Sequence, residues 1–200
     1  MKVIVLGDCL SSSPSWADCI SKKLNCTLVN FSSTYSTNET QIFSLQDYLF
    51  ENNLDFEDII IWQLSKTYNT KMGPSLEEAV SNPSRYYCYL SNQLKNQEVD
   101  FSMSSEDQLK EIMSLLTTAR KWTDRILVFR GWREIISSEE TKLMATQLRN
   151  NRIEFLSETL IDWSYENNFF FNTNGVPSYE TQCKFCDKLI IPKFNLMKWI

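Results

Sequence analysis

Short apolar runs alternate with longer amphipathic segments along most of this chain. The runs are rich in β-branched and aromatic residues, as expected for strands buried on both faces of a parallel sheet. They span residues 2–6, 26–31, 58–64, 125–129 and 153–156. The run at 58–64 is the most hydrophobic, yet no stretch is long enough to cross a bilayer. The pattern predicts a soluble protein with five short strands.

The segments between these runs have helical spacing. In residues 15–24, Trp16, Ile20 and Leu24 recur on one face. Further helices are expected at residues 39–51, 104–122, 137–149 and 179–190, the last opened by Pro177-Ser178 and closed by Pro192. Residues 162–171 stay ambiguous. Because strands that alternate with helices form right-handed βαβ units, we predict one domain, residues 1–200. Its fold would be a three-layer α/β/α flavodoxin-like sandwich with a five-stranded parallel sheet of order 2-1-3-4-5.

Two stretches fall outside this alternation. Residues 65–103 form a long excursion with one expected helix, and a loop this long in a compact domain is usually a lid or a contact surface. Its aromatic part either anchors a partner or packs the insertion onto the domain, and it contains Arg85, Tyr86, Tyr87 and Tyr89. The apolar tail, residues 192–200, either covers an edge of its own sheet or docks on a neighbouring subunit. We expect protein partners or self-association through both stretches.

Composition narrows the class of partner. The 200 residues carry a net charge of -5 and a pI near 4.9, which argues against binding to nucleic acid or an anionic membrane. Apolar residues make up 42% of the chain, enough for a sizeable core. No secretory segment leads the sequence, so we expect a cytoplasmic protein whose six cysteines are reduced.

Histidine is absent, and glycine occurs only four times. The chain therefore lacks the commonest general base and the commonest metal ligand, and it has no glycine-rich phosphate loop. Cys183 and Cys186 have the spacing of half a zinc site, but no second pair matches them and both fall in an expected helix. We interpret them as a half-buried helix face and expect neither metal nor cofactor.

Reactive side chains gather at the end of the first strand. Gly7-Asp8-Cys9 closes that strand, and a Ser-rich turn then leads into a helix. This order places Cys9 at the carboxyl edge of the sheet, where open α/β sheets bind ligands. A helix N-terminus close by would favour a negative charge on the thiol. Asp8 either accepts the proton of Cys9 or, as we favour, caps the turn or the next helix.

A second polar group follows the fourth strand at the same edge of the sheet. Arg130, Trp132 and Arg133 could hold a carboxylate, a phosphate or a sugar, because two guanidiniums beside an indole suit such ligands. The alternative is that the arginines pair with Glu134 or lie exposed at the surface. Both interpretations stay open on the sequence alone.

At Gly7-Asp8-Cys9 the sequence resembles the SGNH, or GDSL, hydrolase family, in which a strand ends in Gly-Asp-Ser and the Ser is the nucleophile. Further blocks line up in order over nearly the whole chain. They are residues 29–33, residues 60–67, and residues 172–178 with the helix that follows. The arrangement is similar to short SGNH-like proteins encoded by bacteriophages. The resemblance implies an acyl-transferring α/β scaffold and an acyl-ester or carbohydrate-ester substrate.

The family's reactive positions hold different residues in this chain. Cys9 stands at the nucleophile, and the resemblance places Thr173 and Val176 where the catalytic Asp and His would be. In an acyl-transfer triad, loss of the base or the nucleophile alone lowers kcat on the order of 10⁶-fold. A thiol needs less activation than a hydroxyl, but turnover also requires a group that protonates the leaving group.

The positions that resemble the family's oxyanion hole are also altered. Ser33 or a neighbour stands in place of the Gly of the second block. Ser65 and Thr67 stand near the Gly and Asn of the third block, and Asn69, two residues further on, could substitute for that Asn. We favour a catalytically degenerate SGNH-like protein that acts in binding or assembly, in a phage particle or an assembly complex.

Two other hypotheses remain. In one, the protein is an acyl-ester or carbohydrate-ester hydrolase with Cys9 as nucleophile and Asn69 or backbone amides as the oxyanion hole. In the other, Arg130 and Arg133 bind a small anionic or sugar ligand.

Overall fold

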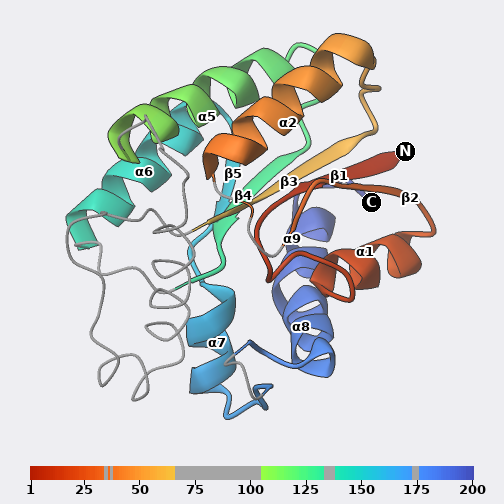
Figure 1. Ribbon diagram of the computed structural model, residues 1–200, viewed down its shortest axis with the longest axis vertical. Coiled ribbons are helices and arrows are strands. Elements are labelled where there is room, and N and C mark those ends of the chain that lie inside the picture. The colour runs from red at the N-terminus through yellow and green to blue at the C-terminus, as the bar shows by residue number, and fades with distance from the viewer. Residues whose placement is uncertain (34–35, 37, 66–104, 133–137, 173–175) are drawn as a thin grey trace, which may run out of the picture.

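The computed structural model describes residues 1–33, 36, 38–65, 105–132, 138–172 and 176–200. Within these ranges the chain forms a five-stranded parallel sheet of order β2-β1-β3-β4-β5, as predicted (Figure 1). The strands are β1 (Lys2–Leu6), β2 (Thr27–Asn30), β3 (Ile59–Leu64), β4 (Ile126–Arg130) and β5 (Glu154–Leu156). Val3 pairs with Ile59, and Ile60 pairs with Ile126, so β3 lies at the centre of the sheet.

Helices cover both faces of this sheet and complete the three-layer sandwich (Figure 1). On one face lie α2 (Asn38–Glu51), α5 (Ser105–Ala119) and α6 (Ser138–Asn150), which bury Leu45, Leu116 and Leu148 against the strands. The other face carries α1 (Trp16–Leu24), α7 (Leu160–Glu166), α8 (Tyr179–Phe185), η1 (Cys186–Ile190) and α9 (Ile191–Leu196). The ambiguous segment 162–171 therefore begins inside α7.

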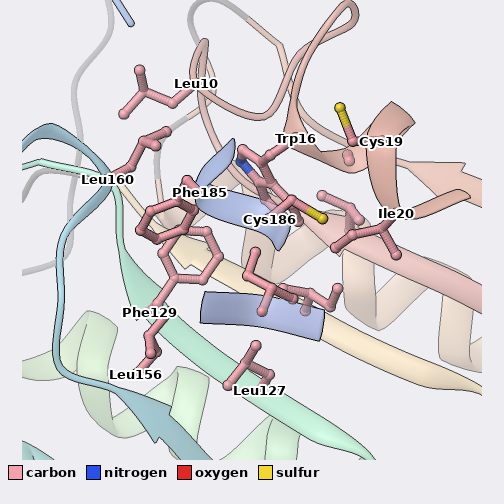
Figure 2. Close-up of a cluster of buried hydrophobic side chains, with 14 of the residues drawn as sticks. Leu10, Trp16, Cys19, Ile20, Leu127, Phe129, Leu156, Leu160, Phe185 and Cys186 are labelled. Carbon is pink, nitrogen blue, oxygen red and sulfur yellow. The ribbon is translucent and has the colours of Figure 1, made fainter. Parts of the chain in front are cut away.

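The alternation of side chains along each strand divides the apolar residues into two cores. In β1, Val3 and Val5 face the core under α1 and α8, whereas Ile4 and Leu6 face the core under α2 and α5. Phe129 of β4 is fully buried, with ring centroids 5.1 Å from Trp16 and 5.6 Å from Phe185 (Figure 2). A strand buried on both faces favours apolar residues on both of its sides, which explains the nearly continuous apolar runs in the sequence.

Pro192 does not end the last helix, which contradicts the sequence prediction. The helix passes from α8 through the π turn η1 into α9, and Pro192 lies in the first turn of α9. The Ile191 amide donates to the Cys186 carbonyl, five residues back. A proline within a helix clashes with the carbonyl four residues before it and lacks an amide donor. The wider π turn just before Pro192 gives the chain room to continue.

The C-terminal tail packs partly onto its own domain. Phe194 and Trp199 belong to the core under α1 and α8, and their ring centroids are 5.3 Å apart. Lys193 pairs with Glu154 of the edge strand β5 at 2.7 Å. Leu196 and Ile200 remain exposed. Docking of this tail on a second subunit stays a prediction.

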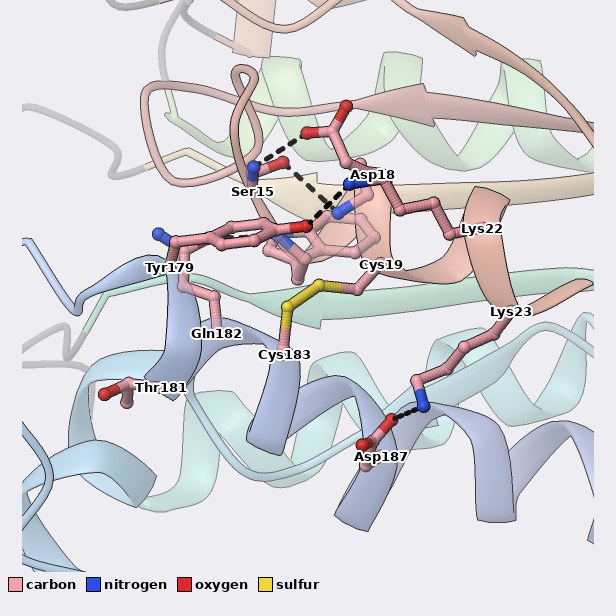
Figure 3. The surroundings of a disulfide bond; sticks show 12 residues. Ser15, Asp18, Cys19, Lys22, Lys23, Tyr179, Thr181, Gln182, Cys183 and Asp187 are labelled. Atoms are coloured by element: carbon pink, nitrogen blue, oxygen red, sulfur yellow. Dashed lines mark hydrogen bonds and ion pairs between the residues drawn. A yellow bond between two sulfur atoms is a disulfide. The ribbon is translucent and has the colours of Figure 1, made fainter.

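The structure corrects the expectation that all cysteines are reduced. Cys19 of α1 and Cys183 of α8 form a disulfide, with Cα atoms 5.7 Å apart (Figure 3). Cys183 is therefore not half of a zinc site, and Cys186 lies buried in the core. Cys9 and Cys26 form no disulfide and are half-buried. No helix among the described residues is both long and apolar enough to span a membrane.

Candidate functional site

The turn after β1 is built from short local hydrogen bonds. The Asp8 carbonyl accepts from the amides of Ser11 and Ser12, at 2.9 and 3.2 Å. The Ser15 hydroxyl then donates to the Ser11 carbonyl, while Ser15 also caps α1 in a capping box with Asp18. Small hydroxyl residues favour such turns because their side chains bond to nearby backbone groups. The turn carries Asp8 and Cys9 at the carboxyl end of β1, as the sequence predicts.

Asp8 is a buried carboxylate held by neutral donors. Its Oδ1 accepts from the Leu10 amide at 3.0 Å, and its Oδ2 accepts from Trp132 Nε1 at 2.7 Å. Burial raises the pKa of this carboxyl, and the hydrogen bonds oppose that rise. The bond to Leu10 is the turn-capping contact that we favour from the sequence.

The thiol of Cys9 also reaches this carboxylate. Cys9 Sγ lies 3.8 Å from Asp8 Oδ1, with the thiol as donor. A thiolate at this position would lie beside a carboxylate, and the two negative charges would repel each other. The thiol is therefore a further donor to the Asp8 carboxylate, beside Leu10 and Trp132.

Gln63 of β3 joins the turn to the centre of the sheet. Its Oε1 accepts from the Ser11 hydroxyl at 2.7 Å and from the Asp8 amide at 3.4 Å, and its Nε2 donates to the Leu64 carbonyl. The side chain is fully buried. Gln63 was not among the residues predicted for the site, although a lone polar side chain in the most hydrophobic strand is a signal that could have indicated it.

Two glycines make room for Gln63. A Cβ atom at Gly7 would lie 2.9 Å from Gln63 Oε1, and one at Gly131 would lie 2.8 Å from Gln63 Cδ. Both distances are too short for a real contact, so Gly7 and Gly131 allow the turn and the β4 end to approach the amide closely.

The residues predicted as a ligand-binding group at the end of β4 have different surroundings in the structure. Trp132 is buried and directs its indole N–H at Asp8, so its ring forms part of the turn's support. Arg130 is half-buried at the end of β4, where it pairs with Leu64 across the sheet. Arg133 lies outside the described residues, as do Thr67 and Asn69.

At the third block, Ser65 is bonded to α2. Its amide donates to Asn38 Oδ1 at 2.9 Å, and its hydroxyl accepts from Gln41 Nε2 at 2.6 Å. Ser65 is buried, so neither its amide nor its hydroxyl is directed at a substrate.

The second block, residues 29–33, is hydrogen-bonded to the turn after β1. Asn30 Nδ2 donates to the Ser11 carbonyl at 2.9 Å, while Asn30 Oδ1 accepts from the Ser32 amide. Ser33 is exposed, and its carbonyl accepts from the Ser36 amide.

Val176 lies in the core next to the start of α8. It is buried among the apolar residues under α1 and α8, the core against which Cys9 also packs. Its carbonyl accepts from the Asn172 amide at 2.7 Å, beside a bridge between Phe171 and Pro177. Thr173 lies outside the described residues.

The first turn of α8 fastens this segment to α1. Gln182 Oε1 accepts from the Trp16 amide at 3.1 Å, and Gln182 Nε2 donates to the Pro177 carbonyl at 3.0 Å. The structure thus brings the turn at 7–16 and the segment that contains Val176 together in one corner of the molecule.

Sequence comparison gives no relative for this chain: no family model matches it, and no curated protein does. Solved structures do match over nearly the whole length. One described as TesA has a TM-score of 0.62 at 12% identity, covering 98% of this chain and 99% of its own. A lipolytic G-D-S-L family member from Veillonella parvula has a TM-score of 0.60 at 11% identity, covering 98% of each chain.

A psychrotrophic esterase, EstA from Pseudoalteromonas sp., is similar at a TM-score of 0.56 and 12% identity, covering 97% of this chain and 98% of its own. Identities this low establish a shared fold and not a shared activity. The sheet order and the helices on its two faces agree with these neighbours. The chain therefore has the α/β fold of the SGNH/GDSL hydrolases.

Proposed function

We propose that this protein keeps the SGNH hydrolase fold without hydrolytic turnover and acts in binding or assembly. The observation that carries the proposal is Val176, a buried apolar side chain at the position that resembles the family's general base, in a chain without histidine. An apolar side chain accepts no proton and returns none to a leaving group.

The hydrogen bonds around Cys9 support the same conclusion. Asp8 is bonded to Leu10 and Trp132, and the amide of Ser65 donates to Asn38. The groups that a hydrolase would direct at its substrate instead stabilise the fold. Loss of the base alone lowers kcat on the order of 10⁶-fold in a serine triad, so little turnover would remain.

The partner would be a protein. Residues 65–103 and the tail at 192–200 are the stretches that we assign to contacts, and the tail exposes Leu196 and Ile200. Resemblance to short phage-encoded proteins makes a phage particle or its assembly complex the setting that we favour. Light scattering on the purified chain tests self-association: a species larger than the 23.5 kDa monomer is expected, and a strict monomer would count against assembly through copies of this chain.

Ester turnover tests the absence of catalysis. The wild type, Cys9→Ala and Cys26→Ala would be assayed with p-nitrophenyl acetate and with longer acyl chains. Cys26 is the matched control because it too is half-buried and outside any disulfide. We expect the three proteins to hydrolyse these esters at the same slow rate. Turnover that disappears in Cys9→Ala and persists in Cys26→Ala would overturn the proposal.

One contact favours a second candidate, an acyl-ester or carbohydrate-ester hydrolase with Cys9 as nucleophile. Asp8 Oδ1 lies 3.8 Å from Cys9 Sγ, and burial raises the pKa of Asp8 toward the range of a general base. In such an enzyme Asp8→Asn and Cys9→Ala would lower kcat to the same level. A rate in Asp8→Asn equal to that of the wild type would exclude this candidate.

A further inference from the structure

We propose that the Cys19–Cys183 pair is a thiol–disulfide exchange site whose redox state sets how firmly α8 is held against α1. Its reagents would be low-molecular-weight thiols and disulfides of the glutathione class. Neither the fold nor the proposed binding function requires this site, and it would remain if that function failed.

The disulfide joins the two elements that flank the candidate site. Cys19 lies in the first half of α1, directly after the turn that carries Cys9, and Cys183 lies in α8, directly after the segment that contains Val176. The two cysteines are 164 positions apart in sequence, so the bond closes most of the chain into one loop. In Figure 3 the sulfur bridge spans the space between the two helices.

One other polar link across this interface, from the Trp16 amide to Gln182 Oε1 at 3.1 Å, is buried, and two more lie at the surface. Lys23 pairs with Asp187 at 2.8 Å, but both side chains are more than two-fifths exposed. Lys22 donates to the Tyr179 hydroxyl at 3.3 Å, also at the surface. Exposed ion pairs contribute little to stability because water and salt screen them. The disulfide is therefore the strongest single link between the outer surfaces of α1 and α8.

The first turn of α8 also holds the segment before it. Thr181 Oγ1 donates to the Phe170 carbonyl at 3.1 Å, and Gln182 Nε2 donates to the Pro177 carbonyl. Motion of this turn away from α1 would carry the Phe171–Pro177 bridge with it. The inner contacts of Phe185 with the sheet would remain, so opening would be local.

Thiol–disulfide exchange begins when a thiol from solution reaches one of the two sulfur atoms of the disulfide. Cys19 is 4% exposed, whereas Cys183 is half-buried and is the more accessible partner. Cys186 lies three residues beyond Cys183, but it is fully buried, and burial raises its pKa to about 12. A thiol that stays protonated is a poor nucleophile, so Cys186 does not serve as a resolving thiol.

The reaction balances with two external thiols. A thiolate attacks Sγ of Cys183, the Cys19–Cys183 bond breaks, and Cys19 leaves as a thiolate that takes up a proton. A second reagent thiolate then attacks the reagent sulfur of the mixed disulfide. Cys183 leaves as a thiolate that takes up a proton, and the two reagent molecules leave joined by a disulfide. Both cysteines end as thiols, and oxidised reagent reverses the sequence.

Peptide mapping and hydrogen exchange on the full chain test the site. After treatment with oxidised glutathione, we expect a cross-linked peptide that contains Cys19 and Cys183, and reduced glutathione should remove it. On reduction, amide exchange should rise at least about tenfold in residues 16–24 and 176–185, while β1 and β3 stay protected.

Variants separate the disulfide from the rest of the fold. Cys19→Ser/Cys183→Ser should exchange like the reduced wild type in either glutathione buffer, and Cys26→Ser should behave like the wild type. Three results would overturn the proposal: no cross-linked peptide under oxidising conditions, identical exchange in both redox states, or loss of protection throughout the sheet on reduction.

Discussion

Two aspartates are buried at opposite ends of the sheet, and their surroundings differ. Asp58 precedes β3 and accepts from the amides of Lys2 and Asp55, at 2.6 and 3.0 Å. The Lys2 ammonium lies 3.8 Å from the same carboxylate. Asp8 follows β1 at the carboxyl edge and accepts only from neutral donors among the described residues, one of them Trp132.

The difference shows where the fold still resembles an active site. Asp58 has a cation and backbone donors, which is how a structural carboxylate is satisfied. The described residues that donate hydrogen bonds to Asp8 are neutral, and one of them is a thiol, the kind of environment that enzymes use to perturb an acid. Among the described residues of that corner, Gln63 bonds to Ser11 and Asp8, and Trp132 bonds to Asp8, which supports the proposal that the corner has a structural role.

Gly131→Ala should have the largest effect, because it crowds the Asp8 corner. The new Cβ would overlap Gln63 Nε2 and lie 2.8 Å from Leu10 Cδ1. Overpacking of this kind costs about 1–3 kcal/mol of unfolding free energy. We expect a cost near the upper end of this range, because the hydrogen bond to Ser11 holds Gln63 in place. Chemical denaturation would measure the loss. In a Gln63→Ala background the added cost should shrink, and an unchanged cost would show that Gln63 is not the obstacle.

Asp58→Asn should follow, with a loss of about 2 kcal/mol. An amide retains one acceptor, so the amide of either Lys2 or Asp55 would face an NH₂ group without a hydrogen bond. Asp8→Asn should cost less at neutral pH, because it also removes a buried carboxyl whose donors among the described residues are all neutral. Denaturation of both variants at pH 7 checks the order, and a greater loss for Asp8→Asn would contradict the comparison.

Trp132→Phe should destabilise the protein by about 1.5 kcal/mol. The phenyl ring keeps most of the buried surface but removes the N–H that donates to Asp8 Oδ2. Because that bond lowers the pKa of Asp8, its loss should move the pKa further up. The cost should be smaller in an Asp8→Asn background, and a double-mutant cycle measures this coupling. Additive effects would show that the indole stabilises the fold through packing alone.

The free energy of unfolding should change with pH because Asp8 has a different pKa in the folded and unfolded states. Burial raises its pKa in the folded protein above the ordinary 3.8, so the folded state binds the proton more tightly than the unfolded state. The stability that protonated Asp8 contributes is therefore fully present below pH 3.8. It is lost as the pH rises through the pKa of Asp8 in the folded protein. Relative to Asp8→Asn, the wild type should lose stability over this interval. Parallel stability curves for the two proteins would contradict the assignment.

Lys2→Gln should have the smallest effect, less than about 1 kcal/mol. The ammonium is partly exposed, and both oxygens of Asp58 already accept from backbone amides. Thermal unfolding at low and high salt would show a small, salt-sensitive change. A loss as large as that of Asp58→Asn would mean that the cation, not the amides, satisfies Asp58.

The sequence predicted the sheet because each strand is a local pattern. The runs at β1 and β3 are apolar except at Lys2 and Gln63, and alternation with helices leaves few topologies. The prediction failed at Pro192, where the tertiary fold accommodates a residue that local rules treat as a helix end. The local rule does not anticipate a π turn.

The site was predicted less completely, because its contacts are distant in sequence. The turn at Gly7-Asp8-Cys9 and its edge of the sheet follow from a strand that stops at glycine. The bond between Asp8 and Trp132 spans 124 residues, and the disulfide spans 164. No residue pattern specifies such pairs. Gln63 was overlooked because a single polar residue in a strand has many possible partners.

The most direct test of the central claim is the ratio of kcat/KM for ester hydrolysis between the wild type and Cys9→Ala, with Cys26→Ala as control. If the turn that carries Asp8 and Cys9 has only a structural role, the ratio stays within about twofold of one for every acyl-chain length. A ratio above about tenfold that Cys26→Ala does not reproduce would identify Cys9 as a working nucleophile and contradict this account.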